Sequence, residues 1–93
     1  MLHILRTTGK KLPKKRGIYA VVTGTYVGEL FAYVEERGKS FRFLSLPKMI
    51  IREVPEDNFE FAIDNNIMEY VEQLPRDVYR VIEAQFKHTN KNA

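Results

Sequence analysis

A cluster of lysine and arginine residues near the start of the chain is the first feature of the sequence with a clear chemical use. Residues 1–16 hold six cations and no acid, whereas residues 53–83 hold nine acids against two arginines. A basic loop of this density can neutralise several phosphates, and each contact adds about one unit to the salt dependence of binding. A solvated loop that protects a sheet edge from aggregation is the alternative. The candidate phosphate contacts are Lys10, Lys11, Lys14, Lys15 and Arg16.

A short turn with two glycines follows the basic segment. Gly24 and Gly28 flank Thr25-Tyr26-Val27, and each glycine can adopt a positive φ or let another surface approach the backbone. The turn could present backbone N–H groups to a phosphate, or it could simply reverse the chain. Tyr26 at its centre is the aromatic side chain that we expect to be exposed and able to stack on a base.

The sequence offers little for catalysis or metal binding. Its two histidines lie near the two ends of the chain, and no serine or threonine occupies a nucleophile elbow. The acids between Glu56 and Asp64 lack the tight alternation and the turn glycine of an oxygen-ligand loop. Neither turn glycine leads into a helix with a lysine, as a phosphate loop requires. We therefore expect a protein that is not an enzyme and that holds no metal ion or cofactor.

The composition favours one small folded domain. A chain of 93 residues, of which 44% are hydrophobic and 29% charged, has room for a single core. It contains no cysteine, which suits a reducing compartment. Arg6 and Lys10 interrupt the N-terminal residues before a signal-peptide core could form, and the apolar runs are too short to span a membrane. The expected location is cytoplasmic, without a membrane partner.

Alternating side chains predict strands at residues 18–23, 30–36, 40–46 and 48–54. The first of these has apolar residues on both faces, which predicts a central position in the sheet. Gly38 between the second and third strands predicts a tight hairpin with a positive φ. Residues 59–63 also alternate and predict a fifth strand, with a helical turn as the competing interpretation. Short strands joined by tight turns are typical of a small antiparallel barrel.

The last third of the sequence changes to a helical period. Asp64 or Asn65 can cap a short helix, and Pro75 fits the first turn of a second helix. The predicted apolar stripes are Ile67, Tyr70, Val71 and Leu74 for the first helix, and Val78, Val81, Ile82 and Phe86 for the second. The expected fold class is α+β, mainly β, in one domain: a basic arm (1–17), the barrel of about five strands (18–63), two short C-terminal helices (64–87) and a frayed tail (88–93).

The stretch GIYAVVTGTYVGELFAYV, residues 17–34, resembles a KOW motif. The resemblance rests on Gly17, a valine-rich strand, Gly24, Tyr26, Gly28 and a second strand ending at Val34. KOW domains are small SH3-like barrels of ribosomal proteins and transcription elongation factors, where they bind RNA, DNA or the polymerase. The resemblance therefore implies an SH3-like barrel and a partner in transcription or translation.

Two functions fit these observations. The first is a non-enzymatic nucleic-acid-binding protein that places its basic loop on phosphates of DNA or RNA. The second is a protein adaptor or inhibitor, in the style of small phage accessory proteins, that binds a larger host machine such as polymerase or ribosome through its acidic helical part. The oligomeric state does not follow from the sequence.

Overall fold

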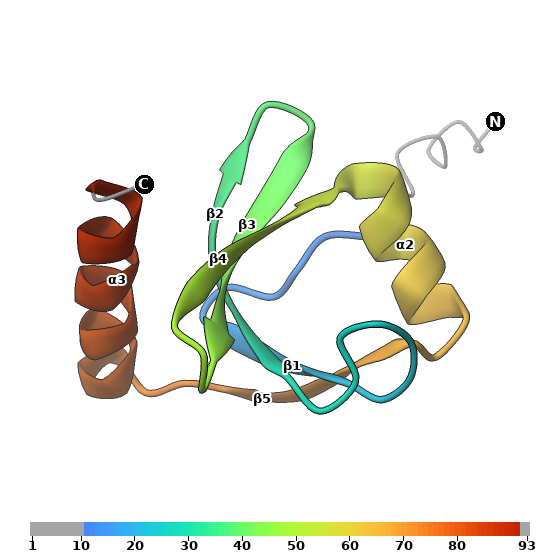
Figure 1. Cartoon of the computed structure of the whole chain (residues 1–93), viewed down its shortest axis with the longest axis horizontal. Coiled ribbons are helices and arrows are strands. Elements are labelled where there is room, and N and C mark those ends of the chain that lie inside the picture. The colour runs from blue at the N-terminus through green and yellow to red at the C-terminus, as the bar shows by residue number, and fades with distance from the viewer. Residues whose placement is uncertain (1–10, 92–93) are drawn as a thin grey trace, which may run out of the picture.

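The computed structural model describes residues 11–91, which form one sheet and two helices (Figure 1). The strands are β1 (Gly17–Val21), β2 (Leu30–Arg37), β3 (Ser40–Leu46), β4 (Ile50–Pro55) and β5 (Met68–Gln73). The helices are α2 (Glu56–Asp64) and α3 (Arg76–Lys91). Within residues 11–91, no helix is long and apolar enough to cross a membrane.

The sheet is antiparallel, with the strand order β4-β3-β2-β1-β5. β1 has a neighbour on each side, as its two apolar faces predict. Gly38 has a φ of +65° in the tight hairpin between β2 and β3, which confirms that prediction. In the described part of the chain, β4 and β5 do not pair with each other. The sheet is therefore open, and the expected closed barrel is not formed by strand pairing.

The fifth strand predicted at residues 59–63 is wrong, and the competing interpretation of a helical turn is right. Phe59 is fully buried, and Ala62 and Ile63 pack partly buried against the same core. Phe61 is 60% exposed. Burial thus follows the spacing of three and four residues that a helix imposes, rather than the alternation of a strand.

Helix α2 stands beside the open side of the sheet. It follows Pro55, and its first turn carries Glu56 and Asp57, whose negative charges interact favourably with the positive end of the helix dipole. The helix contacts β3, β4 and β5 (Figure 1). It therefore packs near both sheet edges and supplies burial that a further strand would otherwise have provided.

Strand β5 replaces the first of the two predicted C-terminal helices. Its residues pair with β1, from Gly17 opposite Gln73 to Val21 opposite Met68. Without β5, the outer N–H and C=O groups of β1 would have no strand partner, which is costly for a strand with one buried and one partly buried face. Val71, expected in a buried helical stripe, is 52% exposed on this edge strand. Pairing with β1 therefore overrides the helical spacing of this segment.

The inner face of the sheet holds an aromatic core. Tyr19 of β1, Phe43 of β3 and Phe59 of α2 are at most 3% exposed. Tyr19 and Phe59 meet edge to face, with ring centres 5.5 Å apart. These contacts join the sheet to α2, and the other buried members of the cluster are Val21, Phe31, Phe41 and Met68.

Helix α3 packs on the outer face of the sheet, opposite to α2 (Figure 1). Its buried side chains are Ile82 and Phe86, and Ile82 clusters with Ala32 of β2 and Leu44 of β3. Both faces of the central strands are thus covered. The predicted second helix is confirmed, but of its predicted apolar stripe only Ile82 and Phe86 are buried, whereas Val78 and Val81 are 45% and 65% exposed. The helix extends to Lys91, so the tail expected to fray from His88 is helical as far as Lys91.

Arg42 of β3 explains why the end of α3 stays docked. Its guanidinium lies 5.5 Å from the ring centre of Phe86, and its Nη2 donates to Oδ1 of Asn90 over 3.4 Å. The side chain of Arg42 is only 11% exposed. A helix terminus without such contacts frays easily.

We expect Arg42→Met to lower the free energy of unfolding by about 1 kcal/mol, because it keeps the aliphatic packing and removes the polar contacts. Amide hydrogen exchange in the last two turns of α3 should accelerate. Lys87→Ala, an exposed change on the same helix, is the control. Unchanged exchange in Arg42→Met would contradict this role.

Candidate functional site

Three basic residues, Lys14, Lys15 and Arg16, form a tight turn with Gly17, here called the basic turn, where the chain enters β1. The Gly17 N–H donates to the Lys14 carbonyl over 2.8 Å. Arg16 has a φ of +57°, an unusual value for a residue with a side chain. The Lys14 N–H donates to the Tyr19 hydroxyl over 2.8 Å, which ties the turn to the aromatic core. The cations of the turn therefore project from a fixed backbone.

A second set of hydrogen bonds fastens the basic turn to the segment between β5 and α3. The Leu74 N–H donates to the Arg16 carbonyl over 2.8 Å, and Arg16 Nε donates to the Leu74 carbonyl over 3.0 Å. Gln73 Nε2 donates to the Lys15 carbonyl over 2.9 Å. These bonds connect residues 58 positions apart and bring the start of α3 next to the turn.

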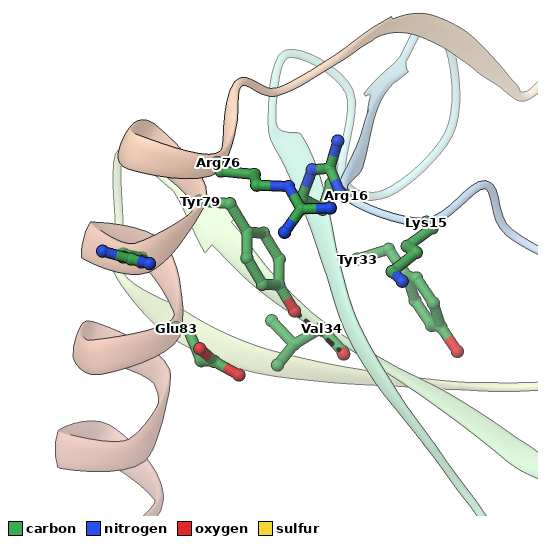
Figure 2. Close-up of a pocket in the computed structure, with 8 residues that line it drawn as sticks. Lys15, Arg16, Tyr33, Val34, Arg76, Tyr79 and Glu83 are labelled. Carbon is green, nitrogen blue, oxygen red and sulfur yellow. Dashed lines mark hydrogen bonds between the residues drawn. The ribbon is translucent and has the colours of Figure 1, made fainter.

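The turn and α3 together enclose a pocket of about 290 Å³, which we call the cationic pocket (Figure 2). Figure 2 shows Arg16 from the basic turn and Arg76 from α3 extending toward the same opening, close to the Tyr79 ring. The residues that line the pocket are Lys15, Arg16, Tyr33, Val34, Arg76, Tyr79, Arg80 and Glu83.

The charge balance of the cationic pocket is strongly positive. Four cations and a single acid, Glu83, line it. Among the described residues, Lys15, Arg76 and Arg80 form no ion pair within 4.0 Å. The pocket therefore carries an excess of positive charge that Glu83 offsets only in part, and an anion in the pocket would reduce the repulsion among the cations.

The two tyrosines of the pocket contribute neutral hydroxyl groups. Burial raises the pKa of both Tyr33 and Tyr79 above the ordinary value of 10.0, and nearby acids raise it further. Neither ring therefore adds negative charge at neutral pH. The Tyr79 hydroxyl donates to the Val34 carbonyl over 3.2 Å, which holds α3 against β2 at the pocket (Figure 2).

The structure divides the five cations predicted as phosphate contacts. Lys15 and Arg16 line the cationic pocket. Lys14 lies over the Tyr70 ring, 5.3 Å from its centre. Lys11 forms an ion pair with Asp64 at 2.7 Å, so an acid of the last third compensates this charge. Lys10 lies outside the described residues.

Arg76 and Arg80 were not singled out in the sequence, although they complete the pocket. They stand four residues apart, so they share one face of a helix. The sequence contains that spacing, but both arginines fall within a segment whose overall charge is acidic. Only their position beside the basic turn makes them part of a cationic site.

The turn between Gly24 and Gly28 reverses the chain, and N–H groups at this turn donate to backbone carbonyls nearby. The two glycines have φ values of +95° and +94°, as expected. The Val27 N–H donates to the Gly24 carbonyl, the Gly28 N–H to the Val21 carbonyl and the Glu29 N–H to the Tyr26 carbonyl, over 2.9 to 3.2 Å. These three donors are already bonded, so they are not presented to a phosphate.

Tyr26 is 44% exposed, but it lies away from the basic turn. The Arg52 guanidinium stands 4.1 Å from its ring centre and covers one face. Tyr26 and Arg52 line a separate cavity of about 420 Å³ between β1, β4 and α2, which shares no residue with the cationic pocket. The structure thus does not bring Tyr26 together with Lys15 and Arg16.

No family model, curated protein or solved structure matches the chain. Its function is therefore argued from its own geometry. Within the part of the chain that the structure describes, no three acidic or histidine side chains gather in a way that could hold a metal ion.

Proposed function

We propose that this protein is a non-enzymatic nucleic-acid-binding protein that holds backbone phosphates in the cationic pocket. The observation that carries the proposal is the meeting of Lys15 and Arg16 with Arg76 and Arg80, two pairs of cations about sixty positions apart in the chain. An arrangement of unpaired cations around one opening recognises an anion.

The types of cation favour phosphate as that anion. A guanidinium group presents a planar fork of donors that can bond two phosphate oxygens at once. Three of the four cations of the pocket are arginines. Lys14, the residue before Lys15, continues the positive charge along the turn. A polymer with a phosphate at every unit uses such a row of cations better than a single small anion does.

The same proposal assigns the fold to the SH3-like, KOW-type domains. Its support is the resemblance of residues 17–34 and the antiparallel order of β1 to β4. The resemblance also supports a partner in transcription or translation, and the absence of cysteine supports a cytoplasmic location.

Titration of labelled DNA and RNA tests the function. We expect micromolar binding at about 50 mM salt that weakens steeply toward about 200 mM. Changing Lys15, Arg76 and Arg80 together to alanine should weaken binding at least about tenfold and reduce the slope of log K against log salt by about 2. Arg16 is left unchanged because its side chain also bonds Leu74.

The control variant changes Arg37, Lys39 and Lys87 to alanine. It removes the same charge from residues that line none of the three cavities. It should keep the wild-type salt slope to within about half a unit. Equal losses in both variants would mean that net charge alone drives binding, and absence of binding at low salt would overturn the proposal in favour of a protein partner.

A further inference from the structure

A second cavity lies on the other side of the basic turn from the cationic pocket, and we call it the aromatic cavity. It has a volume of about 600 Å³, within the range of roughly 300–1,000 Å³ typical of small-molecule sites. Tyr19, Phe59, Met68 and Tyr70 form much of its apolar wall. Lys11 and Lys14 add cations to its lining.

Tyr70 is the exposed ring of this cavity. It lies on the edge strand β5 and is 41% exposed. The Tyr19 ring supports it from the core side, with ring centres 5.6 Å apart at an angle of 63°. The Lys14 ammonium lies over the ring, 5.3 Å from its centre, so a flat ligand stacks on Tyr70 by displacing this flexible side chain, whose charge can then contact a phosphate.

The two cavities lie on consecutive residues of one turn. Lys14 lines the aromatic cavity and Lys15 lines the cationic pocket. Residues of α2 line the aromatic cavity and residues of α3 line the cationic pocket, so the basic turn separates the two sites. A ligand that occupies both must pass around this turn, which a flexible polymer with several phosphates can do.

Building on the proposed function, we propose that the ligand is a single-stranded nucleic acid, with an unpaired base stacked on Tyr70 and phosphates further along the strand in the cationic pocket. A duplex keeps its base faces stacked on one another and cannot offer one to Tyr70. Asn66, which also lines the cavity, carries an amide that can bond the edge of the base. Cationic grooves beside exposed aromatic rings are the usual means of binding single strands.

The test compares labelled oligothymidylate, oligouridylate and a duplex, each of about 12 nucleotides or base pairs, which suits known single-strand site sizes of about 4–16. We expect both single strands, or one of them, to bind at least about fivefold more tightly than the duplex. The chain has no tryptophan and five tyrosines, so the part of the tyrosine quenching that is lost in Tyr70→Leu reports stacking on that ring. Single strands should quench tyrosine fluorescence more than the duplex does.

Tyr70→Leu keeps apolar bulk on β5 and removes the aromatic face. It should weaken single-strand binding about 5- to 100-fold, abolish most of the quenching and leave duplex binding unchanged. Tyr70→Phe should stay within about twofold of wild type. Val71→Ala, at the next and also exposed position of β5, controls for effects on the strand, and circular dichroism confirms folding of each variant.

Two results would overturn the inference. One is equal affinity for single strands and duplex, and the other is wild-type quenching and affinity in Tyr70→Leu. Either can occur while the Lys15, Arg76 and Arg80 variant still loses binding, so this inference can fail without the proposed function. Failure of every nucleic acid to bind the wild type would overturn both.

Discussion

Replacing Glu29 by glutamine is expected to lower the free energy of unfolding by roughly 2–4 kcal/mol at neutral pH. Glu29, directly before β2, is only 6% exposed. Its carboxylate accepts bonds from Arg52 Nε at 3.1 Å and Nη2 at 2.9 Å, and from the Ser45 hydroxyl, while Lys48 Nζ lies 3.2 Å away. A neutral amide leaves Arg52 without its ionic partner and turns an N–H₂ group toward donors.

The contacts of Glu29 with Arg52, Ser45 and Lys48, here called the Glu29 cluster, also predict how stability changes with pH. Its bonds to Arg52 first, and to Ser45 and Lys48, lower the pKa of Glu29 from 4.5 to about 2, against the opposing effect of burial. A carboxyl whose pKa falls on folding stabilises the folded state above its unfolded pKa, and that contribution is lost as pH falls toward the folded pKa. The difference in unfolding free energy between wild type and Glu29→Gln should therefore shrink between about pH 4.5 and pH 2.

Urea denaturation at a series of pH values measures both effects. Other carboxyl groups titrate in wild type and variant alike, so the difference between the two proteins isolates Glu29. Lys48→Ala is the matched control, because the Lys48 side chain is 60% exposed and its ion pair should contribute less than about 1 kcal/mol. A wild-type advantage that stays constant down to pH 2 would contradict the assignment.

The Glu29 cluster explains the structural role of Tyr26 in the turn between Gly24 and Gly28. Arg52 is held by Glu29 and in turn covers the ring of Tyr26. The Tyr26 side chain is therefore part of a structural stack. Tyr26 is predicted to be exposed because it sits at a turn, where exposure is common. Its contact with Arg52 has no local signal in the sequence, since that contact depends on how β4 lies beside the turn.

The strands from β1 to β4 could be predicted because their signals are local. Alternating side chains and a glycine at a tight turn lie within a few residues of one another, as in the β2–β3 hairpin at Gly38. β3 has the predicted bounds of 40–46, and β2 differs by one residue at its end. The central position of β1 also followed from its own two apolar faces.

The segment from α2 to β5 could not be predicted in the same way, because non-local contacts decide it. Residues 59–63 satisfy a strand pattern and a helix pattern equally well, and residues 67–74 carry helical spacing. The free edge of β1 selects an extended conformation for 68–73, and the aromatic core selects the face of α2 that holds Phe59. Neither partner is visible within the segment itself.

Only half of the candidate site could be predicted, because non-local contacts also bring its two halves together. The charge of Lys15 and Arg16 stands out in the sequence, whereas Arg76 and Arg80 are surrounded by acids. Hydrogen bonds from Leu74 and Gln73 to the basic turn bring the two halves together. Such bonds involve backbone groups and a glutamine amide, which no local pattern identifies.

Gly17→Ala is expected to damage both the fold and the two neighbouring cavities. A Cβ at this position would lie 2.9 Å from the Lys14 carbonyl oxygen and 3.2 Å from Cε1 of Tyr70. The first distance is shorter than real contacts allow, and the atom it meets is backbone, so the basic turn must shift. We expect a loss of about 1–3 kcal/mol in unfolding free energy and at least a fivefold loss of nucleic-acid affinity, because Lys14 and Lys15 move with the turn.

Gly28→Ala separates the effect on stability from the effect on binding. Gly28 has a φ of +94° with nothing within 4 Å of an added Cβ, so alanine there costs backbone strain of about 1–3 kcal/mol without a clash. It lines neither the cationic pocket nor the aromatic cavity. Measured by denaturation and oligonucleotide titration below the melting transition, both variants should be less stable, and only Gly17→Ala should bind more weakly. If the two variants lose affinity equally, the basic turn does not position the site, because general destabilisation would then account for both losses.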